Sequence, residues 1–89
     1  MSADAEFHYR SEVLEQLWHH GVHPTVRTPA VLVHEFVSDL YRYQLRRLRA
    51  QLMHHEFPKP EYYGRVLDLR RRYWLISMPA EDWLVKGTG

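Results

Sequence analysis

The chain has 89 residues, of which 45% are hydrophobic, 26% charged and 13% aromatic, and it contains no cysteine. This composition excludes an intrinsically disordered chain, a disulfide framework and a cysteine-based metal site, and the length suits one domain that buries about 60% of its unfolded surface. The formal net charge of +1 argues against wholesale binding of nucleic acid or membranes. No apolar run is long enough for a membrane span or a signal peptide, so we expect a cytoplasmic protein.

Residues 1–10 are polar and only weakly periodic, which predicts a flexible arm or a frayed helix start. The first clear helix is predicted at about 11–20. Ser11 is a suitable N-cap, Val13 and Leu17 recur on one face, and Gly21 can end the helix in the left-handed conformation. The following loop to Arg27 contains Pro24 and is expected to be extended.

A long central helix is predicted at about 29–55. Thr28 followed by Pro29 is a strong start signal, because threonine can cap free amides and proline fits the first helical position. At about 100° per residue, apolar side chains cover more than half of the circumference, so at least two partner segments must pack against this helix. The apolar arc comprises Ala30, Leu32, Val33, Phe36, Val37, Leu40, Tyr41, Tyr43, Leu45, Leu48 and Leu52.

Pro58 and Pro60 break the chain and predict a third helix at about 60–76, followed by a short helix at about 79–85 and a tail at 86–89. The expected fold is all-α: a small helical bundle of three main helices and a short C-terminal helix, within a single domain spanning residues 11–85. The predicted core contains Trp18, Tyr41, Leu45, Val66, Leu69, Tyr73 and Trp74.

No sequence motif indicates catalysis. His34 and Glu35 begin like the zinc-protease helix motif, but Ser38 stands where the second histidine is required. His19 and His20 point about 100° apart on a helix and form no metal clamp. Phosphate-binding glycine loops and serine nucleophile elbows are also missing from the sequence. We therefore expect no enzymatic activity, no cofactor and no metal.

The charges are unevenly distributed, since residues 1–20 carry four acidic residues against one arginine, and residues 42–72 carry nine basic residues against three acidic ones. Arginines on the central and third helices would merge into one basic patch if these helices pack antiparallel. Such a patch can bind phosphates or an acidic protein surface, although solvated and ion-paired arginines give the same pattern. The candidate patch comprises Arg42, Arg46, Arg49, Arg65, Arg71 and Arg72.

The apolar surface exceeds what so small a bundle can cover, which favours contact with another chain. The candidate interface comprises Leu32, Phe36, Tyr43 and Trp83. The leading hypothesis is a non-enzymatic module for protein–protein interaction or self-association, with a homodimer expected and another protein as the other possible partner. Nucleic-acid binding through the arginine-rich helical face is the alternative, and no membrane contact is expected.

Overall fold

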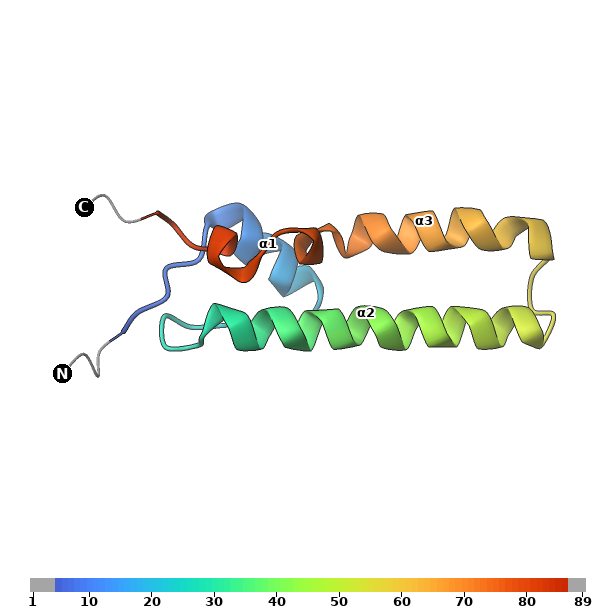
Figure 1. Ribbon diagram of the computed structural model, residues 1–89, viewed down its shortest axis with the longest axis horizontal. Helices are drawn as coiled ribbons and strands as arrows, with labels where there is room; N and C mark the ends of the chain where they lie inside the picture. The colour runs from blue at the N-terminus through green and yellow to red at the C-terminus, as the bar shows by residue number, and fades with distance from the viewer. Residues whose placement is uncertain (1–4, 87–89) are drawn as a thin grey trace.

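The computed structural model describes residues 5–86, which form an all-α fold (Figure 1). Within this range, three α-helices are present: α1 (Ser11–His19), α2 (Ala30–Met53) and α3 (Tyr62–Arg72). A short 3₁₀ turn, η1 (Lys59–Glu61), precedes α3, and two more, η2 (Trp74–Ser77) and η3 (Ala80–Trp83), follow it. The predicted small helical bundle with three main helices is confirmed. None of the helices in residues 5–86 has both the length and the apolar character needed to cross a bilayer.

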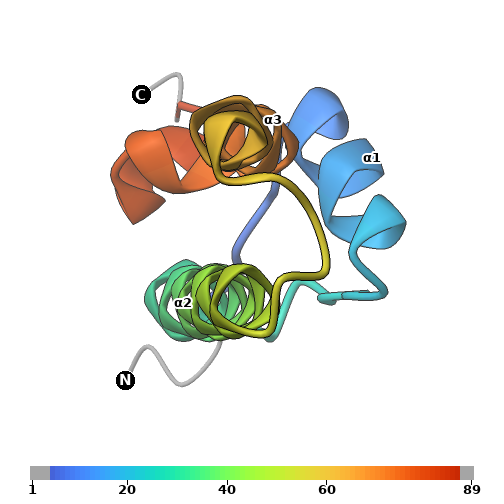
Figure 2. The same ribbon diagram turned by 90° about the vertical axis from the view of Figure 1, so that its right-hand side faces the viewer.

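The molecule is elongated, measuring 55 × 20 × 18 Å, because α2 and α3 run side by side and antiparallel. α1, η2 and η3 gather over the N-terminal half of α2, and the connection 54–61 closes the opposite end (Figure 1). The view along the long axis shows α1 on one side of the α2–α3 pair (Figure 2). Residues 44–72, which we call the distal hairpin, therefore consist mainly of two helices without a third layer.

α1 ends as the sequence predicts. Gly21 has a φ of 76°, and the amide of Val22 donates a hydrogen bond to the carbonyl of Leu17 over 2.9 Å. This is the arrangement that satisfies free carbonyls at a helix end and that glycine adopts without steric cost. The predicted cap at the other end is wrong, because Ser11 already lies inside the helix and Arg10 occupies the N-cap position without a side-chain hydrogen bond that caps the helix.

The start of α2 also differs from the prediction. Pro29 occupies the N-cap position, and the helix begins at Ala30. The Thr28 hydroxyl does not cap the helix, because it accepts a hydrogen bond from the amide of Thr25 over 2.9 Å. The hydroxyl therefore stabilises the turn before α2. The predicted helix end at residue 55 is also too late, since α2 ends at Met53 and His55 has a left-handed φ of 56°.

Two glycine-to-alanine substitutions are expected to change stability in opposite directions. An alanine Cβ would meet no atom within 4 Å at Gly21 or at Gly64, so only backbone preferences should matter. Gly21→Ala should lower the free energy of unfolding by about 1 kcal/mol because of the positive φ, whereas Gly64→Ala inside α3 should raise it by about 1 kcal/mol. Urea denaturation followed by circular dichroism measures both, and a shift in the same direction for the two variants would contradict this account.

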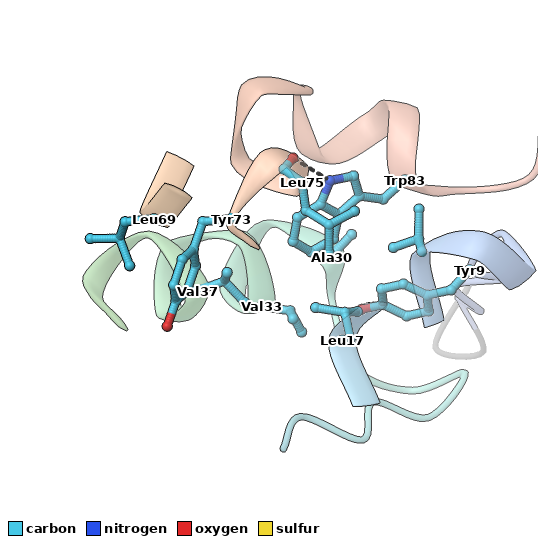
Figure 3. Close-up of a cluster of buried hydrophobic side chains, with 10 residues drawn as sticks. Tyr9, Leu17, Ala30, Val33, Val37, Leu69, Tyr73, Leu75 and Trp83 are labelled. Atoms are coloured by element: carbon cyan, nitrogen blue, oxygen red, sulfur yellow. Dashed lines mark hydrogen bonds between the residues drawn. The ribbon is translucent and has the colours of Figure 1, made fainter. Parts of the chain in front are cut away.

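The hydrophobic core lies at the crowded end of the molecule, where α1, the first half of α2, η2 and η3 meet (Figure 3). Trp83 is completely buried there, and its indole nitrogen donates a hydrogen bond to the carbonyl of Leu75 over 3.0 Å. The assignment of Trp83 to an interface is therefore wrong. The predicted helix at 79–85 is the shorter turn η3, after which Leu84 is extended and pairs with Tyr9.

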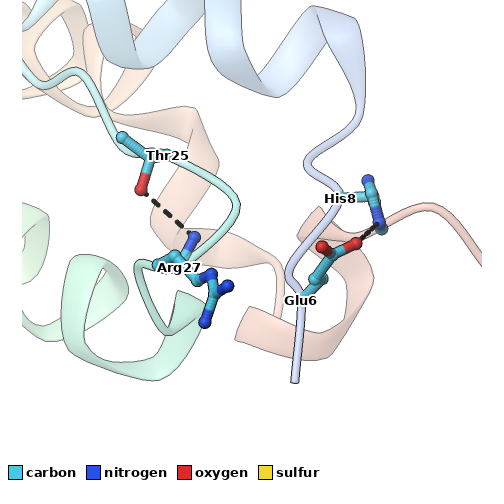
Figure 4. A network of polar contacts seen from close by, with 4 residues as sticks. All are labelled: Glu6, His8, Thr25 and Arg27. Atoms are coloured by element: carbon cyan, nitrogen blue, oxygen red, sulfur yellow. Dashed lines mark hydrogen bonds and ion pairs between the residues drawn. The ribbon is translucent and has the colours of Figure 1, made fainter. Parts of the chain in front are cut away.

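Residues 5–10 belong to the folded structure, contrary to the predicted arm, whose residues 1–4 lie outside the described range. The segment is extended, the amide of Phe7 donates to the carbonyl of Val26 over 2.7 Å, and the amide of Arg10 donates to the carbonyl of Trp83 over 2.9 Å. Tyr9 is buried in the core. Local polar contacts accompany these bonds at the surface, where His8 pairs with Glu6 and the amide of Arg27 donates to the Thr25 hydroxyl (Figure 4).

The predicted third helix, 60–76, is interrupted at Tyr73, which has a φ of −110° and a ψ of 33°. In a continuous α-helix Leu75 would point about 160° away from Tyr73, and so away from the core. The interruption turns the chain into η2 and allows both side chains to be buried. The start also differs, because Pro60 belongs to η1 and α3 begins at Tyr62.

Candidate interaction surfaces

The first candidate surface is a strip of large apolar side chains on α2. Leu32, Phe36 and Tyr43 are 59%, 52% and 53% exposed. Their spacing of four and seven residues places them along one face of the helix. Val33 and Val37, on a different face, are buried in the core. We call Leu32, Phe36 and Tyr43 the apolar strip, and the structure leaves three of the four predicted interface residues accessible.

The charged residues along α2 follow a definite order. Its N-terminal half carries Glu35 and Asp39, and its C-terminal half carries Arg42, Arg46, Arg47 and Arg49. Asp39 and Arg42 form an ion pair of 2.6 Å within the helix. The helix dipole favours acidic residues near an N-terminus and basic residues near a C-terminus, but this effect falls off within the terminal turns. It does not explain the order of charges in the middle of α2.

The second candidate surface is a groove between α2 and α3 with a volume of about 250 Å³. Leu48 and Leu69 supply its apolar lining, and the remaining lining residues are polar or charged: Gln44, Arg47, Gln51, Arg65, Asp68 and Arg72. Gln44 and Arg72 also line an adjoining hollow of about 480 Å³ that reaches Gln16 and His19 on α1 and His20 directly after it. The groove therefore begins where α1 ends and continues along the distal hairpin.

The predicted basic patch is not formed as one surface. α2 and α3 are antiparallel, as the prediction required, but only Arg65 and Arg72 of the six predicted residues line the groove between them. Arg46 lies about 180° around α2 from the buried Val37, because nine residues separate them. Arg42 and Arg49 fall on the outer side of α2 as well. Arg71 forms a 3.4 Å ion pair with Asp68 at the surface of α3.

Sequence reasoning missed Arg47, which lines the groove opposite the α3 arginines. It also missed the role of Phe57, which is buried at the tip of the distal hairpin beneath the guanidinium of Arg65, 4.3 Å from the ring centre. Arg65 additionally forms a 3.0 Å ion pair with Glu61. These contacts hold the Arg65 side chain near the groove.

Two of the seven histidines form hydrogen bonds that join different elements of the fold. The Nε2 atom of His20 lies 2.8 Å from the carbonyl oxygen of Arg72, and its ring stacks on Tyr73. The Nε2 atom of His34 lies 2.8 Å from the carbonyl oxygen of Met78. As hydrogen-bond donors, these rings join α1 to α3 and α2 to the loop after η2. In the described part of the chain, no three histidine or acidic side chains are grouped so that they could hold a metal ion.

Comparisons of the chain with protein-family models, curated proteins and solved structures gave no match. Inference of function therefore depends on the two surfaces described above. Association with another chain through the apolar strip would remove exposed apolar surface from water. The groove offers a combination of positive charge, amide groups and apolar lining.

Proposed function

We propose that this chain is a non-enzymatic helical interaction module that associates with a second copy of itself through the apolar strip of α2. The observation that carries the proposal is the exposure of Leu32, Phe36 and Tyr43 along one face of the longest helix. Burial of apolar surface contributes about 25 cal/mol per Å² to association. The proposed setting is the cytoplasm, as expected from the sequence.

The order of charges along α2 favours an antiparallel dimer. Asp39 and Arg46 are seven residues apart and lie on the same flank of the apolar strip. If two copies of α2 cross antiparallel near Tyr43, Asp39 of each copy faces Arg46 of the other. A parallel arrangement would place this flank of each helix against the other flank of its partner, so the pairs between Asp39 and Arg46 would not form. The dimer also follows the usual symmetry of small homo-oligomers, in which one surface contacts its own copy.

Charge exchange tests this arrangement. Asp39→Arg and Arg46→Asp should each weaken dimerisation roughly tenfold, because each creates two repulsive contacts across the twofold axis. The double variant, Asp39→Arg with Arg46→Asp, restores opposite charges and should dimerise like the wild type. Sedimentation equilibrium at low ionic strength measures the dissociation constants. A double variant that stays as weak as the single variants would exclude the antiparallel pairing.

The apolar strip itself is tested by Phe36→Asp, which should weaken dimerisation by about thirtyfold or more, because it places a charge among the apolar side chains that the dimer buries. Val31→Asp is the matched control, because Val31 is similarly exposed on α2 but points away from the strip. Its dissociation constant should remain unchanged. A wild-type protein that stays monomeric at high micromolar concentration would overturn the proposed function.

Nucleic-acid binding is the alternative function, and it has less structural support than self-association. Nucleic-acid binding would be favoured if the arginines of α2 and those of α3 formed one basic patch. These two sets of arginines face different directions. Tyr43, Tyr63 and Trp74, the aromatic side chains that base stacking would use, do not line the arginine-containing groove.

A further inference from the structure

The groove of the distal hairpin starts beside the end of α1, and α1 leaves it uncovered. α1 has nine residues and extends about 13 Å, whereas α2 has 24 residues and extends about 36 Å. Gln16, His19 and His20 at the end of α1 share a hollow with Gln44 and Arg72, where the groove begins. α1 runs obliquely to α2 and α3 (Figure 2), so a helix that covers the groove would lie along these two helices and not in line with α1.

The chemistry of the groove specifies the charge of this second helix. Three arginines and one aspartate line it; Asp68 is paired with Arg71, and Arg65 is paired with Glu61. Arg65 and Arg72 are seven residues apart on α3, a separation of about 10 Å along the helix axis. Two carboxylates seven residues apart on a neighbouring helix have the same separation. Arg47 on α2 extends this positive lining to the opposite wall.

The lining also provides a place for apolar side chains. Leu48 contributes apolar surface between the arginines, Leu69 behind it is a core residue that is only 5% exposed, and Gln44 and Gln51 offer amide groups on the α2 side. α1 is itself an amphipathic helix with acidic residues, since it buries Val13 and Leu17 and exposes Glu12 and Glu15. An amphipathic helix with acidic flanks fits the lining of the groove better than a nucleic-acid backbone, which has no apolar side chains to place against leucine.

We propose that the groove between α2 and α3 binds an acidic amphipathic helix from another protein, and that this helix completes a third layer over the distal hairpin. Apolar side chains of the bound helix contact Leu48, and its carboxylates pair with Arg47, Arg65 and Arg72. The groove borders the apolar strip, because Arg47 follows Tyr43 by one helical turn, but none of the strip residues lines the groove. The proposal therefore does not rest on self-association.

A synthetic helical peptide tests the proposal with the intact protein. The probe is a fluorescein-labelled 15-residue peptide with leucine at helical three- and four-residue spacing and glutamate on both flanks. Fluorescence anisotropy should show saturable binding, and Arg47→Glu and Arg72→Gln should each weaken binding roughly tenfold. Arg49→Glu is the matched control for charge, because Arg49 lies on the outer side of α2. The affinity of this variant for the peptide should stay within about twofold of the wild-type value. Circular dichroism verifies that each variant is folded.

Two further probes distinguish specific docking from general attraction between opposite charges. A peptide with the same composition in scrambled order, which lacks the apolar face, should bind at least about tenfold more weakly. A labelled single-stranded RNA of equal net charge should also bind more weakly than the helical peptide. Equal binding of the scrambled peptide, equal losses in Arg49→Glu and Arg47→Glu, preference for RNA, or no binding of the helical peptide at low salt would each overturn the proposal.

Discussion

Replacement of Trp83 by alanine is expected to lower the free energy of unfolding by about 3–5 kcal/mol. The side chain is completely buried among residues from α1, α2 and η2, and its removal leaves a large cavity. It also leaves the carbonyl of Leu75 without its indole donor. Because small domains have total stabilities of about 5–15 kcal/mol, the variant should be close to unfolded at 37 °C. Urea denaturation monitored by circular dichroism measures the change.

Trp18→Ala is the matched control, because it removes the same side chain from a position that is 53% exposed. Its stacking partner is His23, with ring centres 6.4 Å apart, and we expect a loss of less than about 1 kcal/mol. Trp83→Phe should fall between the two variants, since it keeps most of the apolar volume but removes the hydrogen bond to Leu75. Equal losses for Trp18→Ala and Trp83→Ala would contradict the core described above.

The contrast between these two tryptophans shows what the sequence can predict. The helices were predictable because apolar periodicity and chain-breaking residues are local signals: Gly21 ends α1, and Pro58 and Pro60 separate α2 from α3. The burial of Trp83 depends on Leu75, eight residues away, and on the direction that the chain takes after Tyr73. Periodicity carries no information about such a bend, because tertiary packing decides it.

The candidate surfaces show the same limit. The exposure of Leu32, Phe36 and Tyr43 follows from an apolar arc wider than one small bundle can cover. The arginines were harder to place, because a helical wheel of α2 alone does not show where α3 lies. Taking the buried Val37 as the inward direction places Arg47 about 80° from it, at the edge of the groove, and Arg46 on the opposite side. The sequence of α2 alone does not show which face of this helix is buried.

Tyr9 is predicted to be essential to stability, although its segment resembles a flexible arm in sequence. Tyr9→Ala should lower the free energy of unfolding by about 3 kcal/mol, because the ring is buried in the core between the N-terminal segment and α2. Tyr9→Phe keeps the ring and should cost only about 1 kcal/mol, the loss of the hydroxyl's hydrogen bond to the carbonyl of Thr28. Urea denaturation at neutral pH measures both values. A Tyr9→Ala variant as stable as the wild type would show that residues 5–10 are not part of the cooperative structure.

The buried Tyr9 hydroxyl is also expected to make the free energy of unfolding depend on pH in the alkaline range. Burial raises the pKa of Tyr9 above its ordinary value of 10.0, because the phenolate would lose its hydration. Above pH 10 the unfolded chain therefore releases this proton while the folded chain retains it, and the stability contributed by Tyr9 declines until the folded pKa is passed. Below pH 10 the contribution is fully present. The difference in the free energy of unfolding between the wild type and Tyr9→Phe should consequently narrow as the pH rises above 10. The other five tyrosines are present in both proteins, so their titration does not contribute to this difference. A difference that stays constant from pH 8 to pH 11 would show that the Tyr9 hydroxyl is hydrated in the folded protein.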